Sequence, residues 1–150
     1  MFKKYIMDKI KVLFVCMHNS ARSQMAEAFL NNLAGDKYYA ESAGLEPGVL
    51  NPLVVESLKE TGIDISGNKT KGVDEFYNKG DTFRYVITVC DETSGEMCPA
   101  FPGNSVRLHW TFEDPSALSG TDKEKMKSIG IIRDKIKEKV LEFLRGAEEI

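Results

Sequence analysis

Short, β-branched apolar runs alternate along the chain with segments of helical periodicity. Each run is long enough for one strand and apolar enough to be buried on both faces of a sheet. Strands that alternate with helices predict an α/β layered fold with a parallel sheet, and right-handed crossovers limit how the chain can wind. The expected strands cover residues 10–16, 38–43, 83–90 and 106–110.

The segments between these strands carry helix signals. Apolar residues recur at helical spacing over residues 25–33, and Gly35 suits the end of that helix. Asn51 and Pro52 fit the N-cap and the first position of a second helix. Two more helices are expected, a short one over residues 73–78 and a long amphipathic one with a charged start over residues 122–144.

The size and charge of the chain limit its class. With 150 residues, roughly 70% of the unfolded surface can be buried, so we expect one domain over residues 1–150, with residues 1–9 as a lead-in segment. The net charge of −3 gives no reason to expect nucleic acid, and no apolar run approaches the ~20 residues of a membrane span. The N-terminus is too charged for a secretory signal, so we expect a cytoplasmic protein without a membrane partner, and a monomer.

Two cysteines lie at the carboxyl ends of predicted strands. Cys16 ends the first expected strand and Cys90 ends the third. In open parallel sheets these ends form one edge, and ligands bind there. We therefore expect Cys16 and Cys90 to lie on the same edge of the sheet.

A polar loop joins the first strand to the first helix and begins at Cys16. Five residues separate that cysteine from Arg22 and Ser23, namely Met17, His18, Asn19, Ser20 and Ala21. Backbone N–H groups of a tight loop at a helix N-terminus form a cradle for an anion. The sequence therefore predicts an oxyanion-binding loop.

Three side chains of this loop have expected roles. Arg22 can bind two oxygens of a tetrahedral oxyanion, and the same positive field favours Cys16 as thiolate, the reactive form. Ser23 can donate a hydrogen bond to that sulfur, and Asn19 can brace the loop through its amide. A buried cysteine and a surface arginine also occur at this spacing by chance, but the strand before and the helix after favour a nucleophile.

Residues 12–28 resemble the signature loop of the low-molecular-weight protein tyrosine phosphatase fold. They are more closely similar to that loop in the thioredoxin-coupled arsenate reductases on the same fold. Further motifs follow in the family's order, so that the resemblance covers roughly residues 10–145. They are Glu41-Ser42-Ala43-Gly44, Asn51-Pro52, Gly62-Ile63-Asp64-Ile65-Ser66 and the stretch from His109-Trp110 to Asp114-Pro115.

The resemblance implies a three-layer α/β/α fold with a four-stranded parallel sheet. It also implies Cys16 as the nucleophile, Arg22 as the oxyanion binder and Asp114 as the general acid. A hydrogen bond between Asn19 and Ser42 is implied as the contact that holds the loop.

Asp114 depends on the resemblance more than Cys16 does. A protonated carboxyl group beside a bound oxyanion can give its proton to a leaving oxygen. From the residues alone, Asp114-Pro115 would be interpreted as a common turn, and Glu113 is an adjacent competitor. The family motif selects the acid directly before the proline.

Cys90 and Cys98 separate a reductase from a phosphatase, which needs only Cys16. The resemblance to the reductases implies that Cys16 attacks arsenate. Cys90 would then attack the Cys16 sulfur and release arsenite. Cys98 attacks Cys90, and thioredoxin reduces the resulting disulfide. A straight helix over residues 90–98 would hold their Cα atoms ~12 Å apart, whereas a disulfide tolerates about 7 Å, so we expect this segment to refold on oxidation. Either cysteine taken singly would be interpreted as a structural thiol.

We expect no bound cofactor, with thioredoxin as the external reductant. Two histidines and three dispersed cysteines match no zinc spacing. Some arsenate reductases of this group bind potassium, and Asn19, Glu27 and Ser42 match three of the positions involved. A fourth, an aspartate, is replaced near Gly72, which speaks against potassium here.

Two other functions stay open at this point. One is a low-molecular-weight phosphotyrosine phosphatase, although Ser116 and Ala117 stand where such phosphatases often carry aromatic residues. Weak phosphatase activity is expected of the same loop in any case. The other is a non-enzymatic sensor that binds arsenite or an oxyanion, which needs neither Asp114 nor turnover.

Overall fold

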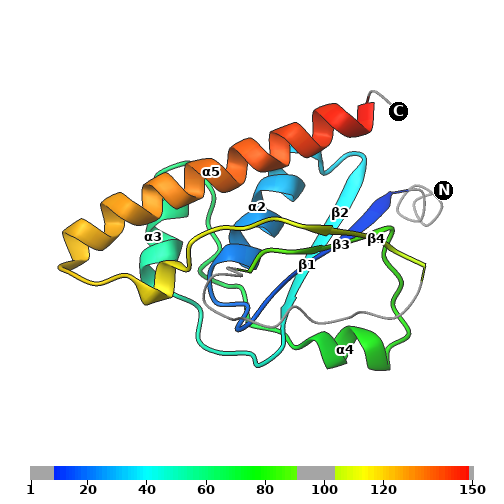
Figure 1. The fold of residues 1–150 in the computed structure, drawn as a ribbon, viewed down its shortest axis with the longest axis horizontal. Coiled ribbons are helices and arrows are strands. Elements are labelled where there is room, and N and C mark those ends of the chain that lie inside the picture. Colours follow the sequence, from blue (N-terminus) through cyan, green and yellow to red (C-terminus); the bar gives the residue numbers. More distant parts are fainter. Residues whose placement is uncertain (1–8, 91–103, 149–150) are drawn as a thin grey trace.

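A computed structural model describes residues 9–90 and 104–148 of the chain (Figure 1). Residues 1–8, 91–103 and 149–150 are not described. The expected lead-in segment, apart from Lys9, therefore lies outside the described residues. So do Cys98 and nearly all of the segment that is expected to refold on oxidation.

Four parallel strands form one sheet in the order β2-β1-β3-β4. They are β1 (Ile10–Cys16), β2 (Tyr38–Gly44), β3 (Tyr85–Thr88) and β4 (Val106–His109). Because β2 lies on one side of β1 and β3 lies on the other, the winding direction reverses between β1 and β3. Ligands bind at such a switch point, beyond the carboxyl ends of the strands. Cys16, the last residue of β1, is at that point.

Helices cover both faces of the sheet, as Figure 1 shows. One face carries α2 (Arg22–Ala34), α3 (Pro52–Lys59) and α5 (Asp122–Glu148), and the other carries the short α4 (Val73–Asn78). Side chains of β1 alternate between the two layers, as the pleat of a strand requires. Phe14 packs in the larger core, and Leu13 packs in the smaller one with Phe76 of α4. The predicted three-layer α/β/α architecture with a four-stranded parallel sheet is confirmed.

The predicted elements agree with the structure to within a few residues at most ends. β3 is shorter than the predicted run of residues 83–90, although the Val89 N–H still donates to the Val15 carbonyl at 2.9 Å and leads the chain on to Cys90. Hydrogen bonds between Thr121 and Glu124 form a capping box that starts α5. No described helix combines the length and the apolar character needed to cross a membrane.

Candidate active site

The turn from β1 into α2 brings Cys16 and Arg22 together. Cys16 is the last residue of β1 and Arg22 is the first residue of α2, and both are buried. In the described structure Ala21, at the N-cap of α2, makes no side-chain cap bond, and the first turn has no acidic residue. The N–H groups at this end of α2 are therefore suited to an anion, which the helix dipole also favours.

The Cys16 sulfur lies next to two hydrogen-bond donors. The Asn19 N–H lies 3.1 Å from it and the Ser23 hydroxyl lies 2.8 Å from it. Ser23 Oγ also accepts a hydrogen bond from Asn19 Nδ2 at 2.8 Å, so the hydroxyl proton is available for the sulfur. Two donors therefore converge on the sulfur of the candidate nucleophile.

Asn19 is held in an uncommon conformation and braced on both sides of its amide. Its φ of 56° lies in the left-handed region, which asparagine tolerates better than most residues. Asn19 Oδ1 accepts hydrogen bonds from the Lys71 N–H at 2.9 Å and from Gln24 Nε2 at 3.1 Å. Because a backbone N–H can only donate, the Lys71 contact fixes the amide oxygen on that side and turns Nδ2 toward Ser23.

The expected hydrogen bond between Asn19 and Ser42 is wrong. Ser42 Oγ donates instead to Glu27 Oε1 at 3.0 Å, while both acceptor positions of the Asn19 oxygen are taken by Gln24 and Lys71. Ser42 therefore supports the loop indirectly, by fixing Glu27 on α2.

An outer segment, residues 45–51, pairs with the loop and sets its orientation. Four N–H groups of this segment donate to carbonyls of the loop. The hydrogen bonds run from Leu45 to Cys16 at 3.2 Å, from Glu46 to Met17 at 2.8 Å, from Gly48 to His18 at 3.0 Å and from Asn51 to Ser20 at 3.0 Å. Since the N–H of a peptide unit points opposite to its carbonyl, these bonds turn the following N–H groups toward the interior of the loop. Inward N–H groups are what the predicted anion cradle requires.

Gly44 lets β2 approach this loop, and its replacement by alanine should displace the loop. A Cβ atom at Gly44 would lie 2.7 Å from Asn19 N, 2.8 Å from the His18 carbonyl carbon and 2.9 Å from Met17 O. We expect Gly44→Ala to lower stability by about 1–3 kcal/mol and kcat/KM by roughly 10²-fold, since small displacements of reacting groups are costly. Thermal melts and steady-state kinetics measure both effects.

Gly67→Ala is the matched control for that experiment. A Cβ atom at Gly67 would meet nothing within 4 Å. We expect this variant to behave like the wild type. Unchanged turnover in Gly44→Ala would mean that the loop tolerates displacement.

Arg22 and Asp114 meet at the other side of the loop. Arg22 Nη1 donates to the Phe112 carbonyl at 3.2 Å, and Nη2 lies 3.7 Å from Asp114 Oδ2. The second carboxylate oxygen of Asp114 accepts the Ser116 N–H at 2.9 Å, which fixes the side chain at the start of a 3-10 turn. The structure thus places the Asp114 side chain beside Arg22 of the loop.

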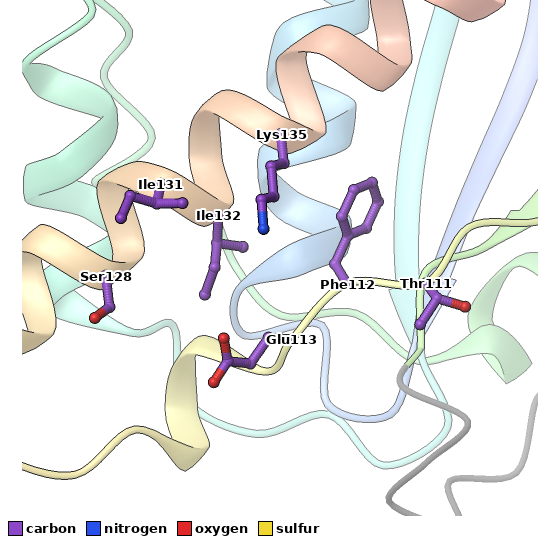
Figure 2. Close-up of a pocket in the computed structure, with 7 residues that line it drawn as sticks. All are labelled: Thr111, Phe112, Glu113, Ser128, Ile131, Ile132 and Lys135. Atoms are coloured by element: carbon purple, nitrogen blue, oxygen red, sulfur yellow. The ribbon is translucent and has the colours of Figure 1, made fainter.

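Glu113, the competing acid, belongs to a different place. It lines a small pocket of about 180 Å³ between the loop after β4 and α5. Figure 2 shows its side chain there together with those of Ile132 and Lys135 of α5. Asp114 therefore lies at Arg22, and Glu113 lies beside α5.

Cys90 lies on the same edge of the sheet as Cys16. It follows β3, whose Thr88 pairs with Val15, the residue before Cys16. Cys90 is buried, and its sulfur lies 4.0 Å from the Val15 carbonyl oxygen. Neither cysteine is part of a disulfide. The structure thus places the two cysteines as the strand pattern predicted, while Cys98 is outside the described residues.

Two polar residues that contact the loop were not predicted from the sequence. Gln24 is buried and joins Asn19 to the Lys69 carbonyl, at 3.1 and 3.0 Å. Lys71 follows in the same irregular segment between α3 and α4. Gln24 lies on a helix and Lys71 in a polar loop, where glutamine and lysine are usually exposed, so no pattern distinguished either residue.

Comparisons with known proteins agree with this geometry. The chain matches the family described as low molecular weight phosphotyrosine protein phosphatase over residues 11–149. An arsenate reductase of Halalkalibacterium halodurans is 40% identical over 138 residues, 91% of this chain and 96% of that protein. The structure of an arsenate reductase in the phosphate binding state is similar, with a TM-score of 0.71 and 31% identity over 91% of this chain and 98% of that chain. A thioredoxin-dependent arsenate reductase of Corynebacterium glutamicum has a TM-score of 0.59 and 30% identity over 93% of this chain and 66% of that chain.

The sheet is parallel, and a cysteine and an arginine flank the loop at its switch point. This arrangement is that of an enzyme with a cysteine nucleophile that acts on oxyanions. The chain belongs to the low molecular weight phosphotyrosine protein phosphatase family. The closer resemblance to arsenate reductases on this fold is confirmed as well. Relatives and solved structures that are 30–40% identical to this chain are arsenate reductases.

Proposed function

We propose that this protein reduces arsenate to arsenite with Cys16 as nucleophile, Cys90 and Cys98 as a disulfide relay, and thioredoxin as reductant. The observation that carries the proposal is the pair of buried thiols at one edge of the sheet, with Cys16 inside an N–H cradle. A phosphatase of this fold needs the first thiol and has no use for the second. The similarity to arsenate reductases, one of them thioredoxin-dependent, supports the same conclusion.

The first step is attack of the Cys16 thiolate on arsenic. An S–As bond forms, and one arsenate oxygen leaves as water after taking a proton from Asp114. Arg22 and the loop N–H groups hold the remaining oxygens and balance their negative charge.

The next steps move two electrons from sulfur to arsenic. The Cys90 thiolate attacks the Cys16 sulfur and forms an S–S bond, while the S–As electron pair passes to arsenic, which leaves as arsenite in the trivalent state. Cys98 then attacks Cys90 and frees Cys16 as a thiolate, and the two thiols of thioredoxin reduce the Cys90–Cys98 disulfide. Because this cycle starts from three reduced thiols, we place the protein in a reducing compartment, the cytoplasm.

The surface beside the loop favours a small oxyanion over phosphotyrosine. A groove of about 410 Å³ is lined by residues 49–53, by the 3-10 turn after Asp114 and by the start of α5. Asn51 Nδ2 donates to Ser116 Oγ at 3.2 Å across two of these segments. The described residues that line it are aliphatic or polar, and none is aromatic. Within the described lining of this groove, an aromatic ring of a substrate would therefore find no ring to stack on.

The relay is tested by serine variants in a thioredoxin-coupled assay with arsenate. We expect Cys90→Ser to lose turnover by at least about 10³-fold, because the Cys16 adduct cannot be resolved, and we expect the same for Cys98→Ser. Both variants should still hydrolyse p-nitrophenyl phosphate weakly, as the wild type does, because that reaction needs only the Cys16 loop.

The competing functions predict other results. Wild-type arsenate turnover in both variants would reject the relay. A wild-type protein that hydrolyses p-nitrophenyl phosphate but does not reduce arsenate would be a phosphatase. A wild-type protein with no turnover on either substrate, but with tight arsenite binding, would be a sensor.

A further inference from the structure

Lys71 lies between two carboxylates behind the oxyanion loop. Its Nζ is 3.2 Å from Glu27 Oε1 on α2 and 2.9 Å from Glu41 Oε2 on β2. The side chains are largely shielded from solvent, with 26% of Lys71, 12% of Glu27 and 21% of Glu41 exposed. Burial alone would lower the pKa of Lys71, but the two carboxylates outweigh it and raise that pKa, so the ammonium form persists.

The main chain of Lys71 reaches the loop itself. Its N–H donates to Asn19 Oδ1 at 2.9 Å, and its carbonyl accepts the Gly44 N–H at 2.8 Å. Asn19 in turn supplies the N–H that lies 3.1 Å from the Cys16 sulfur. One residue therefore links α2 and β2 through its side chain and braces the nucleophile loop through its backbone.

The positions that the family resemblance connects with potassium do not fit that ion here. Asn19 Oδ1 already accepts two hydrogen bonds, from Lys71 N–H and Gln24 Nε2. Glu27 Oε1 also accepts two, from Ser42 Oγ and Lys71 Nζ. Each of these oxygens has two lone pairs to offer, so the donors of the protein already use them. The positive charge beside Glu27 is the Lys71 ammonium.

We propose that Lys71 is a positioning residue that takes the place of a bound monovalent cation and makes the oxyanion loop independent of potassium. The inference rests on the proposed function only in that the loop binds an oxyanion. It predicts an ion response that appears when the lysine is removed. The experiment measures stability and phosphate binding. Its result is therefore independent of whether the protein reduces arsenate.

The experiment compares Lys71→Met with the wild type in choline chloride and in potassium chloride at equal ionic strength. In choline, we expect the Tm of Lys71→Met to be about 5–10 °C below that of the wild type, because two largely shielded carboxylates lose their cation. Inorganic phosphate should bind about 10-fold more weakly by calorimetry, which reports on loop geometry. Potassium should restore at least about half of both losses in Lys71→Met and should leave the wild type unchanged.

Lys69→Met is the matched control, because it removes the same charge from an exposed side chain of the same segment. It should melt and bind phosphate like the wild type. Lys71→Arg keeps a cation in the cluster and should stay indifferent to potassium. A Lys71→Met protein that folds only with potassium would support the proposal. The proposal is overturned if potassium changes the Tm or the phosphate affinity of the wild type or of Lys71→Arg. It is also overturned if potassium improves neither the folding nor the phosphate affinity of Lys71→Met.

Discussion

Replacing Cys16 by serine is expected to abolish both arsenate reduction and phosphoester hydrolysis. The loss in kcat should be on the order of 10⁶-fold, as when a hydrolase loses its nucleophile. The Asn19 N–H and the Ser23 hydroxyl, 3.1 and 2.8 Å from the sulfur, stabilise a thiolate, whereas a serine hydroxyl there stays neutral. Even a serine that attacked arsenate would give Cys90 no sulfur to attack, so no disulfide could form. Thioredoxin-coupled turnover and p-nitrophenyl phosphate hydrolysis measure the two activities.

Binding of the oxyanion provides the control for Cys16→Ser. The inward N–H groups and Arg22 remain, and a negative charge beside the anion is removed. We therefore expect phosphate to bind at least as tightly as to the wild type in a calorimetric titration. Turnover above about 1% of the wild-type value, with normal phosphate binding, would show that a different thiol is the nucleophile.

Cys16 and Arg22 could be assigned to the site from the sequence because local elements position them. A buried strand ends at the cysteine, and a helix starts at the arginine, so the loop between them follows from two element boundaries. Cys90 could be added because the ends of parallel strands share an edge. Asp114 was different: it reaches Arg22 from a distant loop, and only the family motif selected it over Glu113.

The side-chain partners behind the loop could not be read from the sequence. The predicted Asn19–Ser42 bond failed because Gln24 and Lys71 occupy the Asn19 oxygen, which depends on how closely one irregular segment approaches α2. Lys71 joins Glu27 and Glu41 across 44 and 30 positions of the chain, and no periodicity links such residues. Gly44 likewise follows the predicted strand over residues 38–43 with no sign of its role, while its lack of a Cβ is what lets the loop lie against β2.

Arg22→Lys is expected to lower kcat/KM by about 10²- to 10³-fold for both arsenate and p-nitrophenyl phosphate, the cost of one lost oxyanion donor. The guanidinium holds the Phe112 carbonyl with Nη1 at 3.2 Å and directs Nη2 toward Asp114 at 3.7 Å, so its planar fork spans the loop and the acid. A lysine ammonium is a single point on a flexible stem and cannot keep that orientation while it binds two oxygens.

The exposed Arg145 on α5 offers the matched substitution, and Arg145→Lys should leave both activities unchanged. If Arg22→Lys also kept wild-type kcat/KM, charge alone would suffice at this position. The fork geometry would then have no part in catalysis. If instead both substrates lost activity equally, the arginine would act on the oxyanion common to them. A loss confined to arsenate would place its effect after the first attack, in the steps that Cys90 and Cys98 carry out.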